Sequence, residues 1–257
     1  MKIKPKVIIL CGGAGTRLRE ETEFKPKPLV EIGDKPILWH IMKIYSHYGF
    51  NDFILSLGYK GEMIKNYFLN YEYLINDFTL NLSTKKKKVY FHENKIENWN
   101  ITFVDTGNET NTGGRIFKLR DFVDDIFFAT YGDGVANINI KNLLDFHLKN
   151  KKISTLTAVH PVSKYGSIEL RKYNVTEFKE KPELQGWING GFFVFNKEIF
   201  QYLNDNCVLE DEPLKTLAKK NQLSAYLHGD FWQCMDTYKD VVLLNNLWKN
   251  KSPWKMW

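Results

Sequence analysis

Apolar residues in the first half of the chain form short runs, and a segment between two of these runs shows helical spacing. Residues 7–10, 52–57 and 126–131 are three such runs. Runs without polar alternation are typical of strands that are covered on both faces, as in parallel sheets. Between the first two runs, apolar residues recur at helical spacing over 37–48, and Gly49 stands where a helix would end. The pattern predicts an α/β fold.

The remaining segments extend this order of elements. We expect a helix at 61–76, strands at 78–82, 89–91 and 100–104, a helix that opens at 111–114, strands at 153–160, 166–170, 175–180 and 187–195, and helices at 212–220 and 236–249. The strands at 78–82 and 89–91 should form a hairpin, with Lys85-Lys86-Lys87-Lys88 as its solvated turn. No Gly/Ser/Pro-rich linker interrupts the chain, so we expect a single domain over 1–257.

Three glycines follow the first predicted strand almost at once. Gly12, Gly13 and Gly15 fall within four positions, in a spacing that matches neither the dinucleotide-binding motif nor the Walker motif. Glycine allows sharp turns, and its N–H groups can approach a ligand closely. Arg17 and Lys27 add two cations behind this glycine loop, a combination that suits a polyphosphate. The alternative is an ordinary strand-to-helix turn followed by solvated charges.

Two prolines stiffen the segment that carries the second cation. In Lys25-Pro26-Lys27-Pro28, each proline fixes its own φ angle and restricts the residue before it. We therefore expect both lysines to be held in extended backbone close to the glycine loop. A rigid lysine pair in this place favours an anion-binding site over mobile surface charges.

Together, these two segments resemble the signature of the sugar-1-phosphate nucleotidyltransferases. The matching residues are Leu10-x-Gly12-Gly13-x-Gly15-Thr16-Arg17-Leu18 and Lys25-Pro26-Lys27-Pro28. Further segments narrow the resemblance to the cytidylyltransferases of this family and extend it over essentially the whole chain. They are Glu20-Glu21-Thr22, Val30-Glu31-Ile32-Gly33, Pro36-Ile37-Leu38-Trp39-His40-Ile41-Met42, Tyr131-Gly132-Asp133-Gly134-Val135, Gly186-Trp187-Ile188-Asn189-Gly190-Gly191-Phe192-Phe193 and Pro253-Trp254-Lys255-x-Trp257.

The resemblance implies a Rossmann-like fold with a mixed, mainly parallel central sheet flanked by helices and a sugar-acceptor lobe on the same sheet. Residues from about 1 to 135 would form the nucleotide-binding half, and those from about 136 to 257 the sugar-binding and C-terminal helical part. The implied reaction is cytidylyl transfer from CTP to α-D-glucose 1-phosphate. It releases pyrophosphate, and its product, CDP-glucose, feeds deoxysugar and surface polysaccharide synthesis.

The resemblance also implies partners. They are the two small-molecule substrates and further copies of the chain, hexamers being typical of the family, but neither nucleic acid nor a membrane. Trp248, Trp254 and Trp257 fit a subunit interface, because tryptophan often anchors one, and they fit packing on the chain's own core equally well.

Roles for individual residues follow from the same resemblance. Arg17 and Lys27 would be catalytic, through the charge that they place on the phosphates, and helix N–H groups after the glycine loop would add to that charge. Asp133 and Asp236 would hold Mg²⁺, a hard cation that prefers oxygen ligands. Nucleotide-binding residues would be Leu10, Cys11, Gly12, Gly13, Ala14, Gly15, Thr16, Arg17, Lys27, Thr110, Arg115 and Gly132. Residues that bind the sugar phosphate would be Glu180, Lys181, Asn189 and Gly190.

Purely structural interpretations exist for several of these residues. Asp133 lies between two glycines and fits a turn, and Asp236 fits the N-cap of the last helix. Lys181 would then be a surface lysine, and Arg115 a solvated helix residue. The segment 189–191 would be a β-bulge.

The residues alone leave the base and the acceptor open. Cytosine presents an amino donor where uracil and thymine present a carbonyl acceptor, and backbone carbonyls could read this difference without any sequence signal. A thymidylyl- or uridylyltransferase acting on glucose 1-phosphate is therefore an alternative, as is a cytidylyltransferase acting on another phosphorylated acceptor. A nucleotide-sugar binding protein without turnover is an alternative of another class. Such a protein could lose its catalytic charges, all of which are present here.

Composition limits the kinds of ligand, metal site and cellular location that the protein can have. The net charge of +6 favours anionic ligands, and no basic stripe with interleaved aromatics indicates nucleic acid. Cys11, Cys207 and Cys234 lack metal-ligand spacing and are interpreted as reduced thiols, Cys11 as a small buried side chain. The six histidines lack such spacing too, and His40 is interpreted as a packing residue. No apolar run is long enough for a membrane span or a signal peptide, so we expect a cytoplasmic protein.

Overall fold

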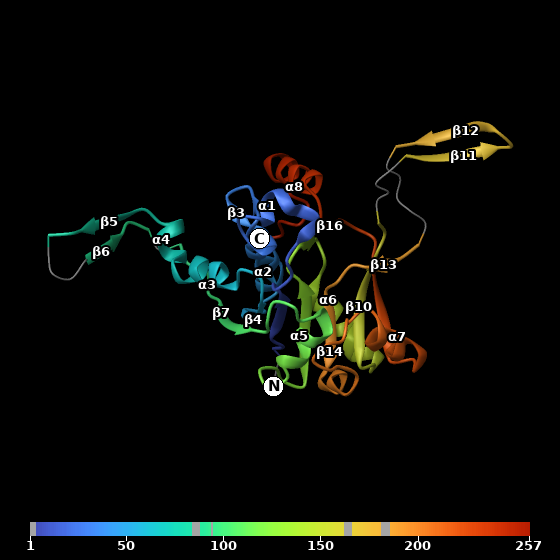
Figure 1. Cartoon of the computed structure of the whole chain (residues 1–257), viewed down its shortest axis with the longest axis horizontal. Coiled ribbons are helices and arrows are strands. Elements are labelled where there is room, and N and C mark those ends of the chain that lie inside the picture. Colours follow the sequence, from blue (N-terminus) through green and yellow to red (C-terminus); the bar gives the residue numbers. More distant parts are fainter. Residues whose placement is uncertain (1–3, 84–87, 94, 162–165, 181–185) are drawn as a thin grey trace.

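A mixed eight-stranded sheet forms the centre of the structure, a computed structural model that describes residues 4–83, 88–93, 95–161, 166–180 and 186–257 (Figure 1). The strand order is β13-β10-β14-β8-β1-β4-β7, and β15 also pairs with β10. Strand β1 runs parallel to both β4 and β8, β4 runs parallel to β7, and β14 runs antiparallel to β8. The prediction of a mixed, mainly parallel sheet is confirmed. Its strands are β1 (Val7–Leu10), β4 (Asp52–Leu57), β7 (Asn100–Asp105), β8 (Ile126–Tyr131), β10 (Ser154–Val159), β13 (Ile188–Asn189), β14 (Phe193–Asn196) and β15 (Leu223–His228).

Helices cover both faces of this sheet. Successive side chains of a strand point to opposite faces, so neighbouring residues of β1 pack against different helices. Ile8 belongs to a buried cluster that contains Leu217 of α7, whereas its neighbour Ile9 belongs to a second cluster that contains Ile41 of α2. All four side chains are fully buried. The helices are α1 (Arg19–Thr22), α2 (Ile37–His47), α3 (Gly61–Leu69), α4 (Tyr71–Ile75), α5 (Thr112–Lys118), α6 (Ile140–Asn150), α7 (Glu212–Lys219) and α8 (Tyr238–Asn250), with 3₁₀ turns at Thr16–Leu18, Lys27–Leu29 and Lys197–Tyr202. Within the described residues, no helix is long and apolar enough to cross a bilayer.

Two predicted elements are divided in the structure. The helix expected at 61–76 is two helices, α3 and α4, with Asn70 between them. The strand expected at 187–195 is β13 and β14, because Gly191 and Phe192 have positive φ angles of 78° and 47°, which an extended strand excludes. The apolar pattern also misses α6 and β15. Most of β15 is only partly buried, so its apolar positions do not stand out.

Four two-stranded ribbons complete the described structure. Two of them, the β5–β6 and β11–β12 hairpins, extend away from the body on opposite sides of Figure 1. Of the predicted lysine turn, Lys88 begins β6, and residues 85–87 lie outside the described part of the chain. The ribbons are β2 (Glu31–Ile32) with β3 (Lys35–Pro36), β5 (Phe78–Asn81) with β6 (Lys88–Phe91), β9 (Gly134–Ala136) with β16 (Trp232–Cys234), and β11 (Ser167–Arg171) with β12 (Asn174–Lys179).

The C-terminal tryptophans pack on the chain's own core. Trp254 is fully buried, and its Nε1 donates a hydrogen bond to Nδ1 of His40 at 3.3 Å. Nε2 of His40 then donates to the backbone oxygen of Ile32 at 2.9 Å, and the ring of Trp248 lies edge-on to the imidazole. Burial lowers the pKa of His40 to about 4, so the ring is neutral at pH 7. The interpretation of His40 as a packing residue is confirmed.

Candidate active site

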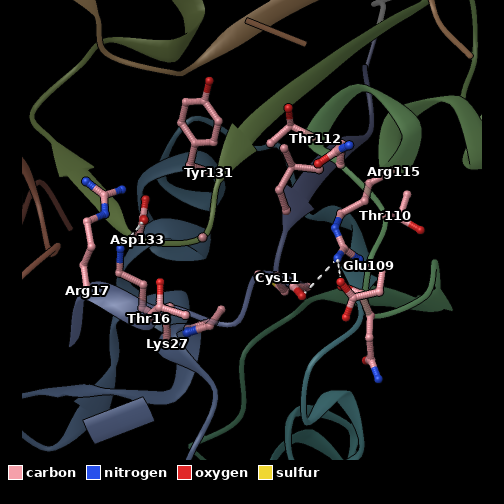
Figure 2. A pocket seen from close by; sticks show the side chains of 18 of the residues that line it. Cys11, Thr16, Arg17, Lys27, Glu109, Thr110, Thr112, Arg115, Tyr131 and Asp133 are labelled. Carbon is pink, nitrogen blue, oxygen red and sulfur yellow. Dashed lines mark hydrogen bonds and ion pairs between the residues drawn. The ribbon is translucent and has the colours of Figure 1, made fainter. Parts of the chain in front are cut away.

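A pocket of about 560 Å³ opens at the carboxyl ends of β1 and β8 (Figure 2). Open α/β sheets bind their ligands at this edge, and the volume is in the range of small-molecule sites. Twelve predicted site residues line it: Leu10, Cys11, Gly12, Gly13, Gly15, Thr16, Arg17, Lys27, Thr110, Arg115, Gly132 and Asp133. Its lining also contains residues that were not predicted as site residues, namely Asn108, Glu109, Asn111, Thr112, Tyr131 and Glu210. Ala14, which was predicted to bind nucleotide, and Asp236, which was predicted to bind metal, are absent from the lining.

Glycine is favoured at two positions of the glycine loop, at one by its backbone angle and at the other by a close side chain. Gly15 has a φ of +64°, in the left-handed region. A Cβ atom on Gly12 would lie 2.0 Å from Nη1 of Arg115. The loop leads into a single 3₁₀ turn and then into α1, a helix of only four residues. The expectation that a helix N-terminus adds substantial charge is therefore wrong, because so short a helix aligns few peptide dipoles. The positive charge at this pocket comes from side chains.

Arg115 ties together the loops that follow three neighbouring strands. Its Nη1 donates to the backbone oxygens of Leu57 and Gly107, at 3.0 and 2.8 Å. Its Nη2 donates to those of Gly12 and Asn108, both at 3.0 Å. The side chain is 4% exposed, so its interpretation as a solvated helix residue is wrong. Arg115 reaches the wall of the pocket, but both of its Nη groups are engaged by the backbone.

Lys27 joins the two aspartates that were predicted to bind metal. Its Nζ lies 2.6 Å from Oδ2 of Asp133 and 2.8 Å from Oδ1 of Asp236. Burial disfavours the charged ammonium, but the two carboxylates outweigh this effect and raise the pKa of Lys27. Lys27 begins the 3₁₀ turn Lys27–Leu29, so the expectation of extended backbone at this residue is wrong. Proline is compatible with the first turn of a helix, and Pro28 occupies that place here.

A short antiparallel ribbon brings the two carboxylates together, although they follow Lys27 by 106 and 209 residues. Strand β16 pairs with β9, and Cys234 lies opposite Gly134. The ladder continues where Met235 N donates to the backbone oxygen of Asp133 at 2.8 Å. Asp236 is therefore held beside the turn that carries Asp133. Both residues reach the pocket edge because of strand pairing between distant segments.

Asp236 is not the cap of the last helix. The N-cap is Thr237, which forms a capping box with Asp240. The Asp236 carboxylate instead faces two cations, Lys27 and Nη1 of Arg17, the latter at 2.9 Å. Burial alone would raise its pKa, but Lys27 and Arg17 together lower it. The Arg17 side chain is 73% exposed, so its guanidinium is accessible from the pocket.

The two aspartates fit a Mg²⁺ ion. Mg²⁺ is usually bound through one or two carboxylates, with substrate phosphates and water as its other ligands. Asp133 and Asp236 supply hard carboxylate oxygens that converge on Nζ of Lys27, so the two carboxyl groups are close enough together to share one ion with it nearby. In the described part of the chain, no group of three or more His, Cys, Asp or Glu side chains is arranged to hold a metal. The donor set therefore suits an ion that arrives with phosphates better than one held in an all-protein cage.

The two cysteines near the site are protonated thiols. Cys11 is 1% exposed, and burial raises its pKa far above the ordinary range. Burial also raises the pKa of Cys234 to about 12, and its thiol donates to Oδ2 of Asp236 at 3.6 Å. Neither thiol has the thiolate character that a nucleophile needs. This agrees with the interpretation of Cys11 as a small buried side chain.

The residues expected to bind the sugar phosphate lie beside the pocket or outside the described chain. Nδ2 of Asn189 donates to Oη of Tyr131 at 3.1 Å, which places the half-buried Asn189 beside this residue of the pocket lining. The backbone oxygen of the next residue, Gly190, accepts from Nε1 of Trp232 at 2.8 Å. Glu180 is exposed, and Lys181 lies outside the described residues.

Tyr131 and Glu210 are the lining residues that connect the pocket to Asn189 through hydrogen bonds, and the sequence did not predict this role. Tyr131 could have been found, because it ends an apolar strand at the edge of the sheet where ligands bind. Glu210 lies in the loop before α7, among several acidic residues, and nothing in the sequence distinguishes it from Asp211 or Glu212.

Comparisons with known proteins agree on one family. The family model of nucleotidyl transferases matches residues 6–249. The chain is 49% identical to the glucose-1-phosphate cytidylyltransferase of Salmonella typhimurium (strain LT2), over 98% of this chain and 99% of that protein. It is 47% identical to the probable glucose-1-phosphate cytidylyltransferase of Bacillus subtilis (strain 168), over 98% of this chain and 100% of that protein.

Solved structures share the fold at lower identity. HddC from Yersinia pseudotuberculosis has a TM-score of 0.70 at 23% identity, covering 95% of this chain and 99% of its own. The CTP:phosphocholine cytidylyltransferase LicC from Streptococcus pneumoniae has a TM-score of 0.63 at 19% identity, covering 96% and 100%. At these identities the likeness concerns the fold alone.

Proposed function

Since this chain belongs to the nucleotidyl transferase family, we propose that it transfers the cytidylyl group of CTP to α-D-glucose 1-phosphate and releases pyrophosphate. The choice of base and acceptor is supported by relatives named glucose-1-phosphate cytidylyltransferases, which match the chain at 47 to 49% identity over almost their whole length. The product would be CDP-glucose.

One observation supports the chemistry most directly. The ammonium of Lys27 lies between the carboxylates of Asp133 and Asp236 at the edge of a pocket that begins with a glycine loop. Cytidylyl transfer brings together two highly charged anions, so it needs preorganised cations at the point of attack. A lysine whose position is fixed by two carboxylates provides such a charge without reorganisation during the reaction.

Different residues would bind different phosphate groups of the two substrates. The backbone of the glycine loop would cradle the triphosphate, because Gly12, Gly13 and Gly15 line the pocket and glycine lets a ligand approach the backbone closely. Lys27 would hold the α-phosphate and the sugar phosphate close together, so that the sugar phosphate oxygen attacks the α-phosphorus in line. Arg17, which is exposed and can form two parallel hydrogen bonds, would bind the departing pyrophosphate.

Nucleotidyltransferases of this family generally use a divalent metal ion, and we propose Mg²⁺ for this chain. Asp133 and Asp236 would hold it. When bound, Mg²⁺ would neutralise charge on the substrate phosphates. The pairing of β9 with β16 keeps both carboxylates at the pocket edge before any substrate enters.

We also propose that the chain forms homo-oligomers, hexamers being the form that the family resemblance suggests. The β11–β12 hairpin supports this, because it has one apolar face, made by Ile168, Leu170, Val175 and Phe178. These four side chains are 51 to 63% exposed. An isolated two-stranded ribbon is marginally stable in water, and an exposed apolar face marks an interaction site. A second copy of the chain is the occupant that we propose for it.

The test is an activity matrix that follows pyrophosphate release in the presence of Mg²⁺. CTP, dTTP, UTP, ATP and GTP are each combined with the 1-phosphates of glucose, galactose and mannose and with phosphocholine. We expect CTP with glucose 1-phosphate to give the highest kcat/KM. A preference for dTTP or UTP would overturn the choice of base, and a preference for phosphocholine the choice of acceptor. Nucleotide binding without turnover in every combination would favour a binding protein.

A further inference from the structure

Glu210 links two sides of the pocket through side-chain hydrogen bonds. Oε1 of Glu210 accepts from the hydroxyl of Tyr131, and Oε2 accepts from the hydroxyl of Thr112 at 2.6 Å. Tyr131 in turn accepts from Nδ2 of Asn189 at 3.1 Å. Thr112 opens α5, and Asn189 ends β13. The chain of bonds therefore runs from the α5 end of the pocket to the strand that precedes Gly190.

Glu210 sets which group donates and which accepts in each of these hydrogen bonds. An ionised carboxylate can only accept, so the hydroxyls of Tyr131 and Thr112 must both donate to it. Once its proton is committed to Glu210, Oη of Tyr131 has only lone pairs left for Asn189. Asn189 must therefore turn its Nδ2, and not its Oδ1, toward Tyr131. The backbone agrees, because Gly191 N donates to Oδ1 of Asn189 at 3.0 Å.

The oriented amide has a fixed set of free hydrogen-bonding positions. Nδ2 of Asn189 keeps one N–H that is not directed at Tyr131, and Oδ1 keeps one lone pair that is not directed at Gly191. If the amide were flipped, its donor and its acceptor would exchange places. A sugar hydroxyl that finds a donor in one orientation would then meet an acceptor in the other.

We propose that Glu210 is a positioning residue for the acceptor sugar, and that it acts through Tyr131 by fixing, together with the Gly191 N–H, the orientation of the Asn189 amide. The proposal rests on the proposed function, because it takes Asn189 as a contact of the sugar. Burial and the neighbouring Glu210 both raise the pKa of Tyr131, which keeps its phenol a neutral donor across the working pH range. The specificity for the sugar thus depends on a residue in a loop far from it in the sequence.

The substitution Glu210→Gln tests the donor and acceptor roles in these hydrogen bonds, because glutamine has almost the same shape as glutamate. The glutamine amide can donate to Oη of Tyr131, which frees the phenol to donate to Oδ1 of Asn189. The bond from Gly191 N, which a flip of the amide would break, is then the support that remains for the original orientation. Tyr131→Phe removes the link altogether. We expect each variant to raise KM for glucose 1-phosphate about tenfold while leaving KM for CTP within about twofold, since one misdirected hydrogen bond to a sugar costs on that order. The matched control is Glu212→Gln, since Glu212 lies two residues away and its carboxylate accepts from the hydroxyl of Thr216, away from Tyr131 and Thr112.

Two further readouts separate this role from a merely structural one. Tyr131 and Glu210 act through the same series of hydrogen bonds. The double variant Tyr131→Phe/Glu210→Gln should therefore have a KM for glucose 1-phosphate no higher than that of the more affected single variant. The ratio of kcat/KM for glucose 1-phosphate to that for galactose 1-phosphate should fall in the variants. Additive losses, or an equal rise in both KM values, would show that Glu210 only braces the pocket, and the proposal would be wrong.

Measurements of glucose 1-phosphate binding test the positioning role of Glu210 independently of the proposed enzyme activity. Calorimetric titration of glucose 1-phosphate, with the α,β-methylene analogue of CTP and Mg²⁺ present, reports sugar binding without turnover. If the wild type binds glucose 1-phosphate but transfers no cytidylyl group, the proposed function fails, and weaker binding by Glu210→Gln still supports the positioning role. If Glu210→Gln binds as tightly as the wild type, the positioning role fails. If the wild type binds no glucose 1-phosphate, both proposals fail.

Discussion

Nζ of Lys27 lies 2.6 Å from Oδ2 of Asp133, so the cation that follows the glycine loop meets the carboxylate at the end of β8. The same ammonium also contacts Asp236 from the far end of the chain. These contacts join the three segments that the proposed chemistry requires. The predictions below follow from them and from the buried groups around them.

Replacing Lys27 should abolish most of the activity. Lys27→Ala removes the charge that we place on the α-phosphate and leaves two carboxylates facing each other, so we expect kcat to fall ~100-fold or more. Lys25→Ala is the control, because Lys25 makes only long ion pairs of 3.8 and 3.9 Å with Glu31 and Glu21. Steady-state pyrophosphate release measures both variants, and near-normal turnover of Lys27→Ala would contradict the catalytic role.

Substitution of Asp236 should change the metal requirement. Asp236→Asn removes one of the two carboxylates that we assign to Mg²⁺, so we expect half-maximal activity to need about tenfold more Mg²⁺. The exposed Asp230 provides the control variant Asp230→Asn. A Mg²⁺ titration of initial rates distinguishes them, and identical titration curves for Asp236→Asn and the wild type would refute the assignment.

Cys11 should be dispensable for catalysis. The buried, protonated thiol has no role in the proposed mechanism, so Cys11→Ala should keep kcat within about twofold of the wild type, at a small loss of stability from the space left behind. Activity and thermal melting of the variant check both statements. A loss of a thousandfold or more with an intact melting curve would indicate a nucleophilic cysteine instead.

Stability should fall as the pH drops from 7.5 to 5. Burial lowers the pKa of His40 to about 4, whereas a histidine in the unfolded chain titrates near 6.5. The unfolded state therefore binds more protons below pH 6.5, and its gain continues until the folded pKa is reached. We expect His40 to account for about 2 kcal/mol of lost unfolding free energy between these two pH values.

Urea denaturation at the two pH values measures this loss. His40→Gln keeps a donor for Ile32 and an acceptor for Trp254 but does not titrate, so its stability should depend less on pH. The exposed His47 supplies the control, His47→Gln, which should keep the pH dependence of the wild type. An unchanged slope in His40→Gln would show that other groups cause the effect.

The apolar face of the β11–β12 hairpin should control assembly. Leu170→Lys places a charge on that face, whereas Glu169→Lys places the same residue on the opposite, polar face. We expect the first variant to dissociate toward the monomer mass of 30.2 kDa and the second to keep the mass of the wild type. Light scattering after size exclusion gives these masses, and a monomeric wild type would refute the oligomer.

Much of the fold follows from local sequence. Strand β4 lies at the residues that its apolar run predicts, and the first long helix ends just before Gly49, as expected. The exceptions have local causes too. Asn70 divides one predicted helix, and the positive φ angles of Gly191 and Phe192 divide one predicted strand. Neither break is visible in hydrophobic periodicity, which records which side of an element is buried and not where its backbone turns.

The candidate site was predictable only in part. The glycine loop, Lys27 and Asp133 carry recognisable signals, because glycine spacing, paired prolines and the end of a strand are features of contiguous residues. Arg115 was predicted through the family resemblance, but not its bonds to backbone oxygens of other loops, and Glu210 carries no signal, since its partners are hydroxyls of other segments. Their functions depend on contacts that only the folded chain creates.

The sequence by itself determined which residue types are present, where the strands of an α/β sheet begin, and that a glycine-rich loop follows the first strand. The tertiary structure decided that Asp236 meets Asp133 across Lys27, because this depends on the pairing of β16 with β9. It also decided that Arg115 holds three loops and that Glu210 directs Tyr131. The physical reason is that local pattern encodes the burial of neighbouring residues, whereas a site depends on distances between segments that are brought together only when the whole sheet forms.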